Sequence, residues 1–420
     1  MSVSAIYSPR VADEELRERL ETSGAVLIEG PKACGKTETA RQAAASEVLL
    51  DVDERARAAA ALDPGLILAG GIPRLIDEWQ VEPRVWNHVR RAVDERRQPG
   101  QFILAGSAVP ADDATRHSGA GRFSRLRMRP MSLFESGRSD GSISLRALMD
   151  GGEARSSNSL ELPEMAELVV RGGWPALQEI PIEAAMKSLT DYLEEVSRTD
   201  INRVDGIHRD PARVRRLLRS LARNVATHVT TTTLAADSSA GGDEPLKRQT
   251  VAEYLSALQR LFVVEDQPPW EPHLRSRSIL RKSPKRHFVD PSLAAAALGA
   301  SPAALLRDLN LFGFLFESLV MRDLRVYSQP IRGEVRQFRD NKGLEIDAVV
   351  ESNAGWAGFE VKLGGPDAID EAATALLKFA REIDTTRTGK AAALGVIVAG
   401  GYGYTRDDGV QVIPITALGP

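Results

Sequence analysis

Short apolar runs alternate with longer amphipathic stretches over the first 135 residues of the chain. The apolar runs lie at residues 25–28, 48–50, 74–76 and 102–104. Runs of this length between helix-like stretches are typical of a parallel sheet whose two faces are covered by helices. The pattern therefore predicts an α/β domain in this part of the chain.

The pattern changes after this region. The stretch "SGRSDGSISLRALMDGGEARSSNSLEL", residues 136–162, is rich in Gly and Ser and indicates a loop-bearing connection. Helical spacing follows over residues 163–235, and "SSAGGDEP" interrupts it. The apolar positions of residues 251–262 recur on one face of a helix that runs into a strand-like end. A helix-turn-helix with a wing is the economical interpretation of this middle region.

The last part of the chain returns to an α/β pattern. A helix at 308–327 precedes strands near 334–339, 345–350 and 357–362. At about 100 to 200 residues per domain, a chain of 420 residues should form two or three domains. We expect three, with these boundaries: residues 1–140, 160–300 and 301–420.

Composition limits the function classes. The net charge is −4, so nucleic acid would have to be bound by local basic patches. Cys34 is the single cysteine, which excludes a disulfide within the chain and favours a reducing cytoplasm. No apolar run approaches the roughly 18 residues of a membrane helix, and the first residues lack the apolar core of a signal peptide. We expect a soluble, cytoplasmic protein without membrane contact.

The segment "GPKACGKT", residues 30–37, fits the phosphate-binding pattern G-x-x-x-x-G-K-[ST] between an apolar strand and a helix. In that pattern backbone N–H groups approach the phosphates, the lysine reaches the β and γ oxygens, and the Thr hydroxyl ligates Mg²⁺. ATP and Mg²⁺ are therefore the expected cofactors. The predicted cofactor-binding residues of this segment are Gly30, Pro31, Lys32, Ala33, Cys34, Gly35, Lys36, Thr37 and Glu38. Within it, Cys34 is interpreted as a small space-filling residue rather than a redox switch.

Two further strand ends add polar groups to this site. The strand of "RLIDEWQ" ends in Asp77, predicted to hold the Mg²⁺ shell, and Glu78, predicted to polarise the attacking water. The strand of "FILAGSA" ends near Ser107, where a sensor of the γ-phosphate would lie. Arg116 and Arg122 are candidates for stabilising transferred charge, although solvated or loop-structuring arginines would look the same.

An ordered set of motifs extends through the chain: "GPKACGKT", "LIDEWQ", "FILAGSA", "GAGRFSRLRMRPMSLFESG", "GGWP", "SPKRHFVDPSLAAAALG", "GFLFESLVMRDL", "FRDNKGLEIDAVVE" and "FEVKLG". This set resembles the bacterial and archaeal AAA-type ATPases that carry a C-terminal DUF4143 domain. The resemblance implies an AAA-like P-loop ATPase domain, a winged-helix middle, and a C-terminal domain similar to restriction endonucleases of the PD-(D/E)xK type. The chain departs from the family at Lys32, where Arg is common, and in "SSAGGDEP", which looks like an extra loop.

In the nuclease-like interpretation, the C-terminal motifs supply a second metal site. Asp347 and Glu360 lie on adjacent strands and would offer a divalent cation two carboxylates. Lys362, two residues from Glu360, projects from the same side and would orient or deprotonate water, and Glu317 adds a third acid. The alternative is that Glu360 and Lys362 are simply the polar face of a strand, because E-x-K alternation is common on exposed strands.

Two basic runs, residues 203–223 and 273–287, are candidates for contacting DNA phosphates. Solvated basic faces are the alternative.

Two functions remain open. The first is an ATPase that couples Mg-ATP hydrolysis to a C-terminal domain that binds or cleaves nucleic acid. The second is a nucleotide-dependent regulator whose inactive nuclease fold acts through protein partners. The sequence is also compatible with assembly into a homo-oligomer.

Overall fold

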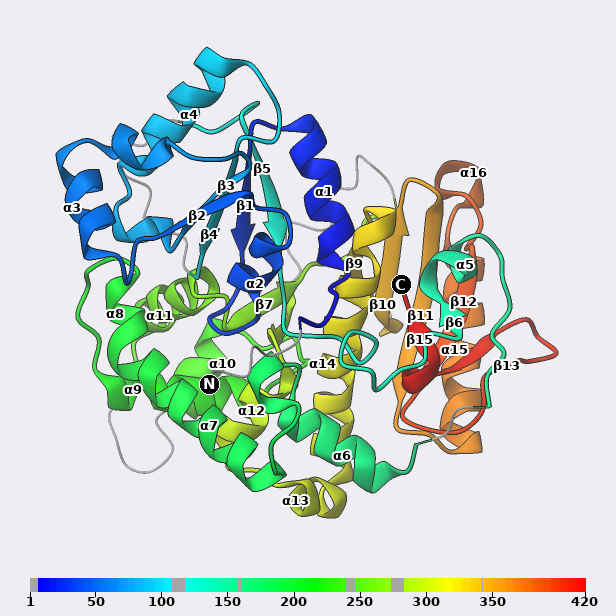
Figure 1. The fold of residues 1–420 in the computed structure, drawn as a ribbon. Coiled ribbons are helices and arrows are strands. Elements are labelled where there is room, and N and C mark those ends of the chain that lie inside the picture. Colours follow the sequence, from blue (N-terminus) through cyan, green and yellow to red (C-terminus); the bar gives the residue numbers. More distant parts are fainter. Residues whose placement is uncertain (1–6, 108–117, 158–159, 239–245, 273–282, 342) are drawn as a thin grey trace. The chain divides into compact units, whose positions relative to one another are not determined.

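The computed structural model describes residues 7–107, 118–157, 160–238, 246–272, 283–341 and 343–420 (Figure 1). The chain divides into two compact units. Unit 1 comprises Met1–Pro130, Thr199–His208 and Ser256–Phe262, and unit 2 comprises Met131–Arg198, Arg209–Leu255 and Val263–Pro420. The middle region that the sequence delimits at residues 160–300 thus contributes segments to both units.

Unit 1 is built on a five-stranded sheet in which every neighbouring pair is parallel. Its order is β2 (Ser46–Leu49), β3 (Arg74–Asp77), β4 (Phe102–Gly106), β1 (Ala25–Glu29) and β5 (Phe123–Arg127). The helical elements between the strands are α1 (Ala12–Thr22), α2 (Lys36–Arg41), α3 (Glu54–Leu62), η1 (Pro64–Leu68), η2 (Trp79–Val81) and α4 (Val85–Arg96). The α/β fold predicted for this region is confirmed.

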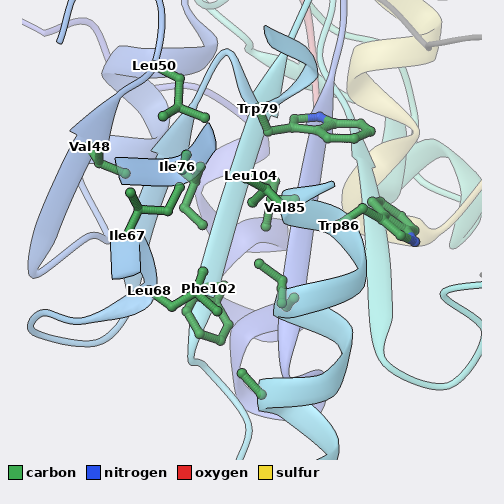
Figure 2. Close-up of a cluster of buried hydrophobic side chains, with 14 of the residues drawn as sticks. Val48, Leu50, Ile67, Leu68, Ile76, Trp79, Val85, Trp86, Phe102 and Leu104 are labelled. Carbon is green, nitrogen blue, oxygen red and sulfur yellow. The ribbon is translucent and has the colours of Figure 1, made fainter. Parts of the chain in front are cut away.

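The two faces of this sheet carry separate hydrophobic cores because successive strand residues point to opposite sides. On β1, Ala25 and Leu27 belong to one core, and Val26 and Ile28 belong to the other. The first core contains residues of α4 and η1 and is drawn in Figure 2, where Trp79 and Trp86 lie beside the strand side chains. The second contains residues of α1 and α2. Burial on both faces explains why the central strands β1 and β4 are almost wholly apolar in sequence.

The first part of unit 2 is mainly helical. Its elements are α5 (Leu145–Met149), α6 (Leu162–Arg171), η3 (Pro175–Leu177), α7 (Ile182–Glu195), α9 (Pro211–Arg223), α10 (Thr231–Asp237), α12 (Pro291–Leu298) and α13 (Pro302–Arg307). The π-helical turn η4 (Val196–Asp200), α8 (Ile201–Arg203) and α11 (Arg248–Arg260) contribute residues to unit 1. Strands β7 (Val264–Gln267) and β8 (Lys285–Phe288) form an antiparallel pair.

The second part of unit 2 is a mixed six-stranded sheet. Its order is β13 (Tyr404–Thr405), β14 (Gln411–Pro414), β12 (Ala393–Val398), β11 (Gly355–Lys362), β10 (Glu345–Ser352) and β9 (Glu334–Arg339). The associated helical elements are α14 (Leu309–Tyr327), η6 (Gln329–Ile331), α15 (Pro366–Glu382), α16 (Thr385–Thr388) and η7 (Ile415–Ala417). Residues of α15 pack with Trp270 and Trp356 in the core of this sheet. In addition, β15 (Leu418–Gly419) pairs in parallel with β6 (Ile143–Ser144).

A buried ionic group fixes α14 within unit 2. The guanidinium of Arg322 lies 2.8 Å from Asp290 Oδ2 and 2.7 Å from Asp323 Oδ1. The side chains of both aspartates are 0% exposed and that of Arg322 is 2% exposed. Burial would lower the pKa of Arg322, but the two carboxylates outweigh it and raise that pKa. All three side chains are therefore shielded from solvent, and the charge of each is balanced within the group.

The same aspartates bind backbone groups from distant motifs. Asp290 accepts a hydrogen bond from the Gly173 N–H at 2.9 Å, and Asp323 accepts one from the Leu133 N–H at 3.0 Å. The Trp174 indole N–H donates to Ser292 Oγ at 2.9 Å. The "GGWP", "FVDPS" and "VMRDL" motifs are thus parts of one buried polar network.

Among the residues that the structure describes, no helix is both long and apolar enough to cross a membrane.

Candidate functional site

The segment of residues 30–37 forms a tight loop between the end of β1 and the start of α2. Ala33 and Gly35 adopt positive φ angles of 60° and 103°, and a glycine takes the second without strain. Gly30 is required for a different reason: a Cβ at this position would lie 2.3 Å from the carbonyl oxygen of Met128. The loop therefore approaches the chain after β5 more closely than a side chain would allow.

Lys36 is folded into this loop and is 6% exposed. Its ammonium donates hydrogen bonds to the carbonyl oxygens of Gly30 at 3.0 Å and Pro31 at 2.7 Å. From outside the loop, Arg10 donates to the Cys34 carbonyl at 2.7 Å. Arg10 could not be predicted as part of this site, because an isolated arginine before a helix gives no local signal in the sequence.

Side chains from the ends of β3 and β4 lie beside the loop. Thr37 Oγ1 donates to Asp77 Oδ2 at 3.0 Å, and Ser107 Oγ donates to Glu78 Oε2 at 3.4 Å. Gln80 Nε2 donates to the same Glu78 oxygen. The structure therefore brings together Lys36, Thr37, Asp77, Glu78 and Ser107, as expected for the carboxyl ends of parallel strands.

The two acids of this group have perturbed electrostatics. Burial raises the pKa of Asp77, and the hydrogen bond from Thr37 opposes the shift. Burial also raises the pKa of Glu78, and the charge of Lys36 opposes it. Glu78 adopts a left-handed backbone conformation with φ 50°. Such a conformation is unfavourable for a residue with a Cβ and is concentrated at functional sites.

The other predicted residues of the loop have different surroundings. Lys32 forms an ion pair with Asp200, which is 4% exposed. Cys34 is a free, buried thiol in the core beside α1 and α2. Glu38 is exposed and pairs with Arg41 at 2.6 Å.

Arg122 is not brought to the loop. Its carbonyl accepts a hydrogen bond from the Ala25 N–H, at the start of β1, whereas the loop follows the end of that strand. Five strand residues separate the two positions by about 16 Å. The Arg122 side chain pairs with Asp94 at 2.8 Å. Arg116 lies outside the described residues.

A second group of charged side chains lies in unit 2. Ala348 on β10 faces Phe359 on β11 in an antiparallel pair, which makes Asp347 and Glu360 the next facing positions. Asp347 Oδ2 accepts a hydrogen bond from the Val361 N–H at 3.0 Å, and Lys362 Nζ donates to Glu360 Oε2 at 2.9 Å. Glu317 on α14 completes the predicted set, whose four members the structure thus brings together.

Lys285, from β8, occupies the centre of this group. Its ammonium lies 2.9 Å from Glu317 Oε1, 2.9 Å from Glu345 Oε1 and 3.0 Å from Asp347 Oδ1. Burial would lower the pKa of Lys285, but the three carboxylates outweigh it and raise that pKa. We call Lys285, Glu317, Glu345, Asp347, Glu360 and Lys362 the carboxylate cluster.

The carboxyl groups of the cluster differ in protonation. Burial, reinforced by the charge of Asp347, raises the pKa of Glu317 to about 8 and that of Glu360 to about 8. Contact with His228, whose Nε2 is 3.6 Å away, and with Lys285 lowers the pKa of Glu345 to about 2. The acids of the cluster are therefore not equally charged at neutral pH.

Two members of the cluster, Glu345 and Lys285, are not among the site residues predicted from sequence. Glu345 stands two residues before Asp347, so the alternation of strand side chains places both on one face, and this spacing could have revealed it. Lys285 stands in a basic run, which gives no sign of a place among carboxyl groups. The cluster borders a hollow of about 570 Å³, which is also lined by His228 and Arg339.

The cluster as folded does not fit a divalent cation. Mg²⁺ needs carboxylate oxygens at ~2.0 to 2.1 Å. Here Glu317 and Asp347 direct oxygens at the Lys285 ammonium instead. Across the part of the chain that the structure describes, no group of three or more His, Cys, Asp or Glu side chains is arranged to hold a metal ion.

Several arginines of the basic run at residues 203–223 are matched by acids of the fold. Arg209 is buried, with its guanidinium 5.8 Å from the ring centre of Tyr254. Three arginines form ion pairs: Arg213 with Asp210 at 3.6 Å, Arg215 with Glu194 at 3.0 Å, and Arg223 with Asp237 at 2.9 Å. In the second run, Arg286 pairs with Asp266 at 3.1 Å, and residues 273–282 lie outside the described part. DNA binding by these runs stays a prediction.

Comparison with protein families divides the chain into three matched regions. Residues 22–136 match an AAA domain, residues 162–304 match a domain of unknown function, DUF8612, and residues 312–418 match a domain of unknown function, DUF4143. Uncharacterized proteins of Mycobacterium tuberculosis and Mycobacterium bovis are each 25% identical over 409 residues, which cover 96% of this chain and 83% of theirs.

Solved structures give more distant matches. A Walker-type ATPase of Pyrococcus abyssi is 14% identical with a TM-score of 0.41, covering 68% of this chain and 94% of that one. The ORC1 protein of Aeropyrum pernix, solved in complex with DNA, is 14% identical with a TM-score of 0.29, covering 72% of this chain and 97% of that one. The matched regions agree with the sequence motifs: an AAA domain lies at residues 22–136 and a DUF4143 domain at residues 312–418.

Proposed function

We propose that the protein binds Mg-ATP at residues 30–37 and hydrolyses it. The observation that carries this proposal is the contact between Thr37 and Asp77, which joins the loop to the end of β3. A hydroxyl and a carboxylate are oxygen ligands of the kind that Mg²⁺ prefers, so these two residues would hold the ion. A bound Mg²⁺ would neutralise charge on the β- and γ-phosphates.

The remaining side chains of the group take complementary roles. Lys36 would exchange its two carbonyl contacts for phosphate oxygens, which are stronger partners for an ammonium. Glu78 would orient and deprotonate the attacking water, and the hydrogen bonds from Gln80 and Ser107 fix its carboxylate for this purpose. Ser107 would also sense the γ-phosphate.

The test compares two variants with different expected defects. Lys36→Ala should lose ATP binding, measured with a fluorescent ATP analogue. Glu78→Gln should keep binding and lose turnover by roughly 10²- to 10⁴-fold, the usual contribution of a general base. Lys187→Ala, an exposed lysine of α7, is the matched control and should behave as the wild type. Equal turnover in the wild type and Lys36→Ala would exclude the assignment.

For the C-terminal domain, we propose the regulator rather than the nuclease. The observation that favours it is Lys285, whose ammonium takes up oxygens that a metal-dependent nuclease would need for its cation. ATP binding would then act on protein partners through a nuclease-like domain that does not cut.

The second candidate, binding or cleavage of nucleic acid, is supported by Glu317, Asp347 and Lys362, which line one hollow, and by the contact of Lys362 with Glu360. Its test is cleavage of single- and double-stranded DNA and of RNA in Mg²⁺ or Mn²⁺, with and without ATP. Cleavage that Asp347→Ala and Glu360→Ala abolish, while ATP turnover persists, would replace the regulator proposal. DNA binding without cleavage should weaken steeply with salt if basic residues contact phosphates.

A further inference from the structure

Lys285 enters the carboxylate cluster from a strand that otherwise belongs to the β7–β8 pair. On β8, Lys285 and His287 are buried, whereas Arg286 between them points to the other side and pairs with Asp266. His287 contacts Gln267 Oε1 at 3.1 Å and Ser318 Oγ at 2.8 Å. The buried side of β8 is therefore polar and is directed at β7, α14 and β10.

The surroundings of the Lys285 ammonium are those of a coordinated cation. It has three N–H groups, and three carboxyl groups lie within 3.0 Å of it, one from α14 and two from β10. The Lys285 side chain is only 3% exposed. Water contributes little at this position, so the carboxylates are its main source of charge balance.

We infer that the Lys285 ammonium is the resident cation of the carboxylate cluster, and that the DUF4143 domain folds around it without taking Mg²⁺ or Mn²⁺ there. A divalent ion would have to displace a buried ammonium and leave its charge without carboxylate partners, which is costly in a protein interior. The ammonium also links β8 to α14 and β10, as a structural metal would. This inference deepens the proposed regulatory role and is independent of ATP turnover.

The test is a gain of metal binding. Mn²⁺ binding to the nucleotide-free full-length protein is measured by electron paramagnetic resonance for the wild type, Lys285→Ala, Asp347→Asn and the double variant. Lys285→Ala should acquire one additional Mn²⁺ site, because removal of the ammonium leaves carboxylates without a cation. The double variant should lose that site. Asp347→Asn alone should bind as much Mn²⁺ as the wild type does. Mn²⁺ bound outside the cluster is common to all four proteins, so it does not affect the differences between them.

Two results would overturn the inference. One is Mn²⁺ binding by the wild type that Asp347→Asn removes. The other is a folded Lys285→Ala variant that binds no more Mn²⁺ than the wild type.

The Mn²⁺ comparison requires that Lys285→Ala folds. Acylation of the wild type followed by peptide mass spectrometry gives an independent measurement. Lys285 should stay unmodified with or without excess Mn²⁺, while the more exposed Lys362 is modified. Modification of Lys285 that rises with Mn²⁺ would show that the metal displaces it.

Discussion

Replacing Arg322 with Met should be among the most destabilising single changes in unit 2. Met keeps much of the aliphatic length of the side chain but removes the charge that balances Asp290 and Asp323, both without solvent exposure. Removing one partner of a buried ionic group costs about 3 to 5 kcal/mol. That is a large part of the roughly 5 to 15 kcal/mol by which a domain is stable. Arg322→Met should therefore unfold unit 2 at much lower urea concentration.

The assay follows amide hydrogen exchange of α14 during a urea titration, because a chain of two units need not unfold in one step. Arg155→Met is the matched control. Arg155 pairs with Glu153, but its side chain is 84% exposed, and exposed ion pairs contribute little to stability. Burial already raises the pKa of Asp323. Without Arg322 this pKa should rise further. Protonation then removes the unbalanced negative charge, so the loss of stability of Arg322→Met relative to the wild type should shrink as pH falls. Equal stability of the two variants would refute the reasoning.

Three further predictions concern the two sites. Gly30→Ala should weaken binding of a fluorescent ATP analogue, because its Cβ would lie 2.3 Å from the Met128 carbonyl and must shift the loop; unchanged affinity would contradict this close approach. The acid limb of ATP turnover should lie above pH 4.5, the ordinary pKa of a glutamate, because burial raises the pKa of Glu78 and only the ionised carboxylate accepts a proton. A midpoint at or below that value would argue against Glu78 as the base. Glu317 has its pKa raised from 4.5 to about 8, so it contributes stability that is complete below pH 4.5 and lost as pH rises to about 8. In Glu317→Gln the melting temperature should change less with pH across this window. An unchanged slope of melting temperature against pH would show that another group causes the pH dependence.

The positions of site residues can be predicted from sequence where local pattern and strand direction determine them. Asp77 follows an apolar run, and all parallel strands of such a sheet end at the same edge, so its place beside Thr37 could be anticipated. The same rule, applied to Arg122, would have shown that a residue preceding β5 lies at the other edge. The β6–β15 pair could not be anticipated, since each strand has two residues and nearly the whole of unit 2 separates them in sequence.

Lys285 shows a different limit of sequence analysis. A lysine among Arg281, Lys282 and Arg286 looks like one more surface charge, and hydropathy assigns it to solvent. Its burial follows from carboxylates that are 32 and 62 residues further along the chain, so only the tertiary fold reveals the charge balance that allows it.

The ion pair between Lys32 and Asp200 affects how mutational data on the nucleotide loop should be read. Asp200 is almost fully buried in the segment Thr199–His208, and Lys32 reaches it from the loop. Lys32→Ala would leave that carboxylate without its cation, so the variant could be inactive because a helical segment is misplaced rather than because a phosphate contact is gone. In an alanine scan, Lys32→Ala and Lys36→Ala would therefore both lose activity, although for different reasons. Restoring neutrality with Asp200→Asn should rescue Lys32→Ala and leave Lys36→Ala inactive, which separates a folding defect from a binding defect.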